Sequence, residues 1–191
     1  VIVSTDDAEI AEVARHYGAS VPFMRPAELS DDYTGTIPVV RHAIEWCNDH
    51  WQCVKHACCL YATAPFVSAD DLRCGLGVLQ ENDCDYAFSV TSYAFPVQRA
   101  LRLTEQGRIA MFNPEHFNTR SQDLDEAYHD AGQFYWGRAG AWLHGKMIFS
   151  SDSIPVLLPR HRVQDIDTPE DWARAEWLFK ALQAQAAEST I

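Results

Sequence analysis

The sequence predicts an α/β protein in which helices flank a mostly parallel, Rossmann-like sheet and a small antiparallel arm interrupts the alternation. Short apolar runs typical of buried strands alternate with segments of helical periodicity along most of the chain. Strands joined through helices form right-handed crossovers, which place successive strands parallel. The length of 191 residues suits a single domain with its own core. We therefore predict one domain over residues 1–191, with the arm inserted at 94–130.

The first third of the chain predicts two short strands and two helices. VIVS at the N-terminus and SVPFM further along have the composition of short strands. A helix between them is expected to begin at Asp7 and to end at Gly18, because these are typical first and last residues of helices. A second helix is expected from Thr36. The apolar run HACCLYATAPF then predicts a central parallel strand.

The remaining two thirds continue the alternation around the arm. Ser68 and Asp71 form a capping-box pattern at the start of a helix, and DYAFSVTSY predicts the next strand. QRALRLTEQGRIAMF suggests two extended pieces around a turn at Gly107. GQFYWGRAGAWL predicts a strand and then a helix, and IPVLLP and HRVQDID predict two late strands. The last helix is expected to begin at Pro169.

Composition excludes some classes of partner. The formal net charge of −12 argues against non-specific binding to nucleic acid or to an anionic membrane. No apolar run approaches the roughly 20 residues that a membrane span needs. The six cysteines lie in apolar runs and are expected to be reduced core residues of a cytoplasmic protein. The regular spacing within CNDHWQCVKH resembles a zinc site, but this run crosses from a helix into a strand, so its side chains should not converge.

The strongest chemical signal is the pair Asp165 and Asp167, separated by one isoleucine. If this segment is a strand, both carboxylates point to the same face. Two like charges this close are unfavourable unless a cation lies between them or one is protonated. A Mg²⁺ ion shared with a nucleotide phosphate would supply that cation. The alternative is structural: one acid faces solvent and the other caps the following helix.

Two further segments contain candidate binding residues. In MRPAELSDDYTGT, a proline-fixed bend follows Arg25, and Ser30, Asp31 and Thr34 provide donors and acceptors. Loops at the carboxyl ends of strands are where open α/β sheets bind ligands. A loop of this composition is also consistent with a plain solvated connection.

The second segment, TRSQDLDEAYHDAGQFYWG, places polar groups against aromatic residues, as sugar sites often do. Arg120 offers a planar, bidentate donor for a carboxylate. Gln122 and Tyr135 add further polar groups. The structural alternative is an arm stabilised by polar contacts on its surface, and spacing alone does not separate the two.

Together these stretches resemble the sugar-acid cytidylyltransferases, which make CMP-activated nonulosonic acids. The resemblance runs nearly end to end, from VSTDDAEIAEVARHYGASVPFMRPAELSDDYTGT to the closing block QDIDTPEDWARAE. LYATAPF stands where sialic acid members have a Gln-Pro-Thr-Ser-Pro loop. LYATAP, RSQDL and DAGQFY are closer to the pseudaminic acid branch than to the sialic acid branch.

This resemblance implies a nucleotidyltransferase that converts CTP and pseudaminic acid into CMP-pseudaminic acid and pyrophosphate, for surface glycans or flagellin. Asp165 and Asp167 would hold Mg²⁺, and one of them, or a hydroxide on the metal, would assist deprotonation. Arg25 and Ser30, with Asp31 and Thr34 of the same loop, would bind the nucleotide. Lining of the sugar-acid site is implied for Ala62, Thr63, Arg120, Gln122 and Tyr135. The arm resembles the family's dimerisation element, so a homodimer is expected.

The resemblance also leaves alternatives. The family opens with a strand and a basic loop that grips the triphosphate, and the sequence starts at the second block, so we expect roughly 40 further residues upstream on the family's length. Alternative functions are a CMP-sialic or CMP-legionaminic acid synthetase, and another transferase that uses an Asp-x-Asp metal site. A protein that binds a nucleotide or sugar acid without turnover is the alternative from outside the enzymes.

Overall fold

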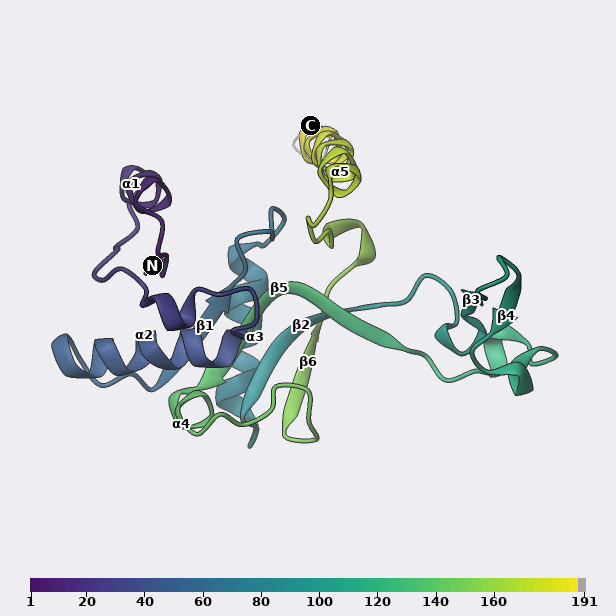
Figure 1. The fold of residues 1–191 in the computed structure, drawn as a ribbon, viewed down its shortest axis with the longest axis horizontal. Helices are drawn as coiled ribbons and strands as arrows, with labels where there is room; N and C mark the ends of the chain where they lie inside the picture. The colour runs from purple at the N-terminus through teal and green to yellow at the C-terminus, as the bar shows by residue number, and fades with distance from the viewer. Residues whose placement is uncertain (189–191) are drawn as a thin grey trace. The chain divides into compact units, whose positions relative to one another are not determined.

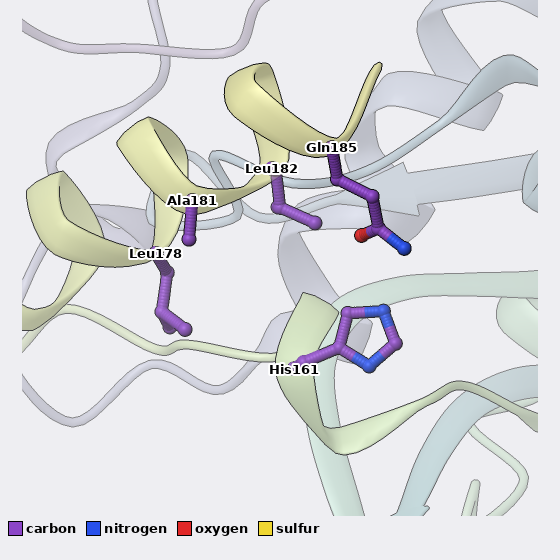
Figure 2. A pocket seen from close by; sticks show the side chains of 5 residues that line it. All are labelled: His161, Leu178, Ala181, Leu182 and Gln185. Carbon is purple, nitrogen blue, oxygen red and sulfur yellow. The ribbon is translucent and has the colours of Figure 1, made fainter. Parts of the chain in front are cut away.

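The computed structural model describes residues 1–188 (Figure 1). By their contacts these residues form two compact units. Unit 1 contains residues 1–59, 83–86 and 136–153, and unit 2 contains residues 60–82, 87–135 and 154 onward. The residues predicted to bind the nucleotide lie in unit 1. Those predicted to bind the metal and the sugar acid lie in unit 2.

The main sheet has four strands in the order β1-β5-β2-β6. Their bounds are His56–Leu60 for β1, Tyr128–Arg138 for β5, Tyr86–Ser92 for β2 and Ser153–Leu157 for β6. In unit 2, Leu158 N donates to Val90 O and in unit 1 Asp85 N donates to Asp152 O, so β2 and β6 are parallel. Bonds from Tyr61 N to Gln133 O and from Ala139 N to Lys55 O show that β5 runs opposite to β1. Bonds from Tyr93 N to Ala127 O and from Arg138 N to Asp85 O show the same for β2. Three of the four strands therefore share one direction, which confirms the predicted mostly parallel sheet.

Unit 1 begins with the expected helix and lacks two expected strands. Helix α1 spans Ala8–His16, and the Asp7 carboxylate caps it by accepting hydrogen bonds from Glu9 N at 2.7 Å and Ile10 N at 3.0 Å. VIVS and SVPFM were predicted as strands, but only one isolated parallel bridge, Ile2 to Ser20, joins them. Helix α2 spans Thr36–His50 and contacts α4, Ala139–Leu143. The short 3-10 helix η1, Ala27–Leu29, lies in the loop before α2.

Tight aromatic packing forms the core of unit 1. Trp142 and Tyr86 are fully buried, and their rings meet edge to face with centroids 4.9 Å apart. Gly137 lies directly against both: a Cβ there would fall 2.3 Å from Trp142 Nε1 and 2.7 Å from Tyr86 Cδ1. Only glycine fits this position of β5.

Unit 2 contains the remaining helices of the α/β alternation. Helix α3 spans Ala69–Glu81, and Ser68 Oγ accepts from Asp71 N at 3.1 Å, which confirms the capping box. Helix α5 spans Pro169–Glu188. HRVQDID was predicted as a strand, and this is wrong: the 3-10 helix η5, Arg160–Arg162, is followed by irregular backbone. Strand β6 ends at Leu157, shortly before Pro159, and the segment that contains Asp165 is not paired as a strand.

The arm in unit 2 is a small antiparallel hairpin. Strands β3, Leu101–Leu103, and β4, Ile109–Met111, pair with Leu103 opposite Ile109, and Gly107 supplies the left-handed turn with φ of 70°. Figure 1 shows the hairpin at the end of the segments that lead out of β2 and back into β5. Three 3-10 helices complete the arm: η2 (Val97–Arg99), η3 (Pro114–His116) and η4 (Ser121–Asp123).

Two further sequence expectations concern cysteines and membranes. All six cysteines are free thiols. Cys47 and Cys84 are buried as expected, but Cys53 and Cys74 are exposed, which corrects the reading of all six as core residues. Among the helices of residues 1–188, none combines the length and the apolar character that a membrane crossing requires.

Candidate active site

The acid pair lies in the irregular segment between η5 and α5. Asp165 and Asp167 are both exposed, and neither forms an ion pair with a basic side chain of the described residues. Asp165 Oδ1 accepts a hydrogen bond from the backbone N of Ile166 at 3.0 Å. Because this segment is not a strand, the argument that alternate residues share a face does not apply to it. Both carboxylates are nonetheless exposed, and no salt bridge of the described residues includes either of them.

The structural alternative for the acid pair is not what the structure shows. Thr168 and Asp171 cap α5: Asp171 N donates to Thr168 Oγ1 at 3.2 Å, and Thr168 Oγ1 donates to Asp171 Oδ2 at 2.7 Å. The hydrogen bond from Thr168 and those from the backbone N of Asp167 and Thr168 lower the pKa of Asp171. The start of α5 is therefore capped by Thr168 and Asp171, and neither Asp165 nor Asp167 is needed as its cap.

Asp165 lies against the backbone of β5 at Gly132. This glycine has φ of 61°, and a Cβ built on it would fall 3.2 Å from Asp165 Oδ2 and 3.3 Å from Asp165 Cγ. The carboxylate therefore occupies space that exists because residue 132 has no side chain. This contact brings Asp165 together with the segment that the sequence singled out as DAGQFY.

Tyr135, predicted to bind the sugar acid, is in that segment but lies beneath the surface. Its side chain is 1% exposed, and its ring packs against Tyr61 and Phe88 with centroids 5.0 and 5.9 Å away. Its hydroxyl donates to Asp130 Oδ2. Burial, together with the hydrogen bond to Asp130, raises the pKa of Tyr135 far above its ordinary value, so the phenol stays neutral.

A polar network underlies the acid pair. Gln164, 7% exposed, donates through Nε2 to Asp165 O at 2.6 Å and to Asp171 Oδ1 at 3.2 Å. Gln133 Nε2 donates to Arg162 O at 2.6 Å and thereby joins η5 to β5. The buried Oε1 of Gln133 has no hydrogen-bond partner among the described residues. Two buried side-chain amides thus hold the backbone at Arg162 and at Asp165.

An ion pair connects this segment to α3. The Arg162 guanidinium donates to both oxygens of Asp71, with Nη2 3.2 Å from Oδ1. Burial would raise the pKa of Asp71, but hydrogen bonds from Arg162 and Ser68 outweigh it and hold the pKa below the ordinary value. The hydrogen bonds that Arg162 donates to Asp71 also raise the pKa of Arg162. The Asp71 carboxylate therefore joins Ser68, the N-cap of α3, to Arg162 of η5.

The other predicted sugar-site residues lie in two places in unit 2. Ala62, exposed, and Thr63, half-buried, follow β1 in the loop whose Tyr61 N donates to Gln133 O at 3.1 Å, so this loop begins beside β5. Arg120 and Gln122 belong to the arm and are exposed. Arg120 grips Asp123 with bonds of 2.8 and 2.9 Å, which raise its pKa. Arg120 therefore binds a carboxylate in bidentate fashion, but that carboxylate belongs to Asp123 of the same arm. The described contacts do not join Arg120 to Asp165.

The predicted nucleotide residues form a loop in unit 1 whose polar groups bond to one another. Arg25 Nε donates to Ser30 Oγ at 3.1 Å, and its Nη2 lies 3.2 Å from Asp6 Oδ1. Asp31 Oδ1 accepts from Thr34 Oγ1 at 2.7 Å and from the backbone N of Tyr33 and Thr34, and the hydrogen bond from Thr34 is the main cause of its lowered pKa. This makes Asp31 a turn-stabilising residue, with Arg25 and Ser30 held in a fixed orientation.

From the sequence we did not predict that five residues belong to this site: Gly132, Gln133, Arg162, Gln164 and Asp71. The sequence indicated Asp71 only for the capping box of α3, not as the partner of Arg162. One of the five carried a signal. An isolated glycine inside a strand pattern indicates a bulge or a close approach, and Gly132 within DAGQFYWG is such a glycine. The ion pair and the buried amides join segments far apart in sequence, so no local pattern could reveal them.

Asp165 and Asp167 are of the residue type that holds Mg²⁺ jointly with phosphates. Carboxylate oxygens are ligands that Mg²⁺ prefers, and the ion is commonly bound by one or two of them together with substrate phosphates. Asp165 and Asp167 offer two such groups, and both are exposed. In the part of the chain that the structure describes, no three His, Cys, Asp or Glu side chains gather closely enough to hold a metal by themselves.

Comparison with known proteins supplies the family context. A family model described as cytidylyltransferase matches residues 1–147. Pseudaminic acid cytidylyltransferase of Campylobacter jejuni is 45% identical over 180 residues, covering 94% of this chain and 78% of that protein. CMP-N,N'-diacetyllegionaminic acid synthase of Legionella pneumophila is 28% identical over 190 residues, covering 96% and 79%. The solved structure of CMP:2-keto-3-deoxy-manno-octonic acid synthetase complexed with CTP matches with a TM-score of 0.59 at 14% identity, covering 97% of this chain and 81% of that one, which supports the fold alone.

Proposed function

Because this chain belongs to the cytidylyltransferase family, we propose that it transfers CMP from CTP to the anomeric hydroxyl of pseudaminic acid and releases pyrophosphate. The observation that carries this proposal is the 45% identity, across 94% of the chain, to a relative named for that activity. The identity to a legionaminic acid synthase is lower, at 28%, and this difference favours pseudaminic acid as the sugar. Use of the product for surface glycans or flagellin stays an expectation from the family resemblance.

The chemistry asks the protein to position two substrates and to stabilise charge. The anomeric oxygen forms a bond to the α-phosphorus, the bond to pyrophosphate breaks, and the hydroxyl loses its proton. Asp165 and Asp167 are the residues that would hold Mg²⁺, since both are exposed carboxylates without a cationic partner in the described residues. Bound there, the ion would neutralise the negative charge of the phosphates. The Gln164 amide holds the backbone from which Asp165 projects.

The remaining predicted site residues keep their proposed roles as substrate contacts. In unit 1, the ordered loop of Arg25, Ser30, Asp31 and Thr34 would contact the nucleotide. In unit 2, we assign the sugar acid to Ala62, Thr63, Arg120, Gln122 and Tyr135. Tyr135 differs from the others because it is buried and hydrogen-bonded to Asp130, so its ring would form the floor of the sugar site.

We also propose that the arm joins two copies of the chain as a homodimer. Leu101, Leu103 and Ile109 lie on one face of the hairpin by its register, and they are 57%, 73% and 62% exposed. A two-stranded hairpin is marginally stable in water, so an apolar face of this kind needs a partner. Light scattering should give the mass of a dimer, and Leu103→Asp should give that of a monomer. A wild-type monomer at assay concentrations would contradict this part of the proposal.

The direct test of the activity is pyrophosphate release by full-length protein from CTP and pseudaminic acid. Release should require Mg²⁺ and should stop when EDTA is added. We also propose that the reaction takes place in the cytoplasm, the compartment that keeps thiols reduced, because the six cysteines lie in apolar runs of the sequence. Calorimetric binding of CTP without any release of pyrophosphate would instead favour a binding protein.

A further inference from the structure

The turn of β5 at Gly132 lies against the Asp165 carboxylate. The φ of 61° at Gly132 lies in the left-handed region that side chains rarely adopt. Asp165 Oδ2, Cγ and Cβ would lie 3.2, 3.3 and 3.7 Å from a Cβ at this position. The first two distances are shorter than ordinary van der Waals contact. A side chain at residue 132 would therefore have to displace the carboxylate.

Asp130 holds this turn in place from within the same strand. Its Oδ1 accepts from Gly132 N at 3.0 Å, and its Oδ2 accepts the Tyr135 hydroxyl. Tyr135 is itself fixed, because it is 1% exposed and packed against Tyr61. Both oxygens of Asp130 are thus used to bind β5 itself, one at the turn and one at a buried anchor three residues beyond it.

We propose that Asp130 and Gly132 are positioning residues for Asp165, and that the turn they form sets the affinity of the site for a divalent cation. This inference rests on the metal role proposed above for Asp165. A metal ligand must be held within about 0.5 Å of its productive position, and residues that orient ligands typically change metal affinity by about 10–100-fold when mutated. Gly132 has no side chain that would displace the Asp165 carboxylate, and Asp130 fixes the backbone of the turn by accepting a hydrogen bond from Gly132 N.

The test compares Gly132→Ala with Gly18→Ala in full-length protein. Gly18 has φ of 86° and open space around its Cβ position, so its alanine variant introduces similar backbone strain without touching Asp165. Binding of Mn²⁺ is followed by loss of the free-ion EPR signal, with and without CTP, using Asp165→Asn to identify the binding that depends on Asp165. We expect Gly132→Ala to bind Mn²⁺ about tenfold more weakly than wild type or worse. Gly18→Ala should bind as wild type does.

The dissociation constant separates positioning from a structural role. If the role of Gly132 is only structural, both alanine variants will have a lower melting temperature, and the folded proteins will bind Mn²⁺ as wild type does. That result would overturn the inference. If Gly132→Ala does not fold, Tyr135→Phe decides: it removes the hydrogen bond to Asp130, keeps the ring, and should weaken Mn²⁺ binding in the same direction, whereas unchanged binding would overturn the inference. Wild-type binding that Asp165→Asn does not reduce would overturn the metal role itself, and this inference with it.

Discussion

Replacing Arg162 by methionine should lower the free energy of unfolding by about 2 kcal/mol, because the change removes both hydrogen bonds to Asp71 but keeps the aliphatic stem. The two side chains are 27% and 15% exposed. A hydrogen bond to a charged group contributes about 1.5–3 kcal/mol when buried, whereas a fully exposed ion pair contributes about 0–1 kcal/mol. Two bonds at intermediate exposure fall between these limits. The melting temperature should drop by about 4–8 °C in a chain of this length.

Chemical denaturation at several pH values measures this loss. Because the folded-state pKa of Asp71 lies below its ordinary value of 3.8, the stabilisation is fully present above the unfolded-state pKa and is lost as the pH falls through the folded-state pKa. The difference between wild type and Arg162→Met should therefore be constant from pH 7 down to about 4 and should shrink below that.

The matched control is Arg73→Met. Arg73 also forms an ion pair, with Asp70 of α3, but these two side chains are 73% and 94% exposed. This variant should leave stability nearly unchanged, since exposed pairs contribute little. Equal losses in the two variants, or an Arg162→Met loss that persists unchanged at pH 2, would refute the reasoning from the buried pair.

Three further predictions concern the site and the core. Asp167→Asn should reduce turnover at least 100-fold, an estimate from the loss of a metal ligand, with no change in circular dichroism or melting temperature; full activity would remove Asp167 from the metal site. Arg120→Ala should raise the KM for pseudaminic acid more than the KM for CTP, and equal changes in steady-state assays would argue for a structural role. Gly137→Ala should destabilise the protein by about 3 kcal/mol, because the new methyl group meets Trp142 Nε1 at 2.3 Å. Gly140→Ala, with open space around its Cβ position, should cause no such loss in the same thermal scans.

Much of the fold could be predicted because its signals are local. Asp7 and Ser68 cap their helices as expected, since a capping side chain bonds to backbone two or three residues away. The apolar runs of β1, β2 and β6 were also recognised as strands. The HRVQDID segment misled because a few apolar residues near β6 suggested continued extension. Pro159 and the η5 turn, which place the chain for Arg162 to reach Asp71, end the strand instead.

The site could be predicted only where single residue types carried the chemistry. Two acids one residue apart identify Asp165 and Asp167 as candidates without any structure. What surrounds them could not be read, because Gly132 and Gln164 act through contacts between β5, η5 and α5 that depend on tertiary packing. Tyr135 was singled out as a polar sugar contact, and its burial against Tyr61 shows why an aromatic residue in a strand has to be judged by its neighbours.

The most direct test of the proposed function is a comparison of kcat/KM for three sugar acids with full-length protein, CTP and Mg²⁺. Pyrophosphate release would be measured separately with pseudaminic, N,N'-diacetyllegionaminic and N-acetylneuraminic acids. We expect the highest kcat/KM with pseudaminic acid. A higher value with either of the other two acids, or no release above background with all three, would contradict the proposed function.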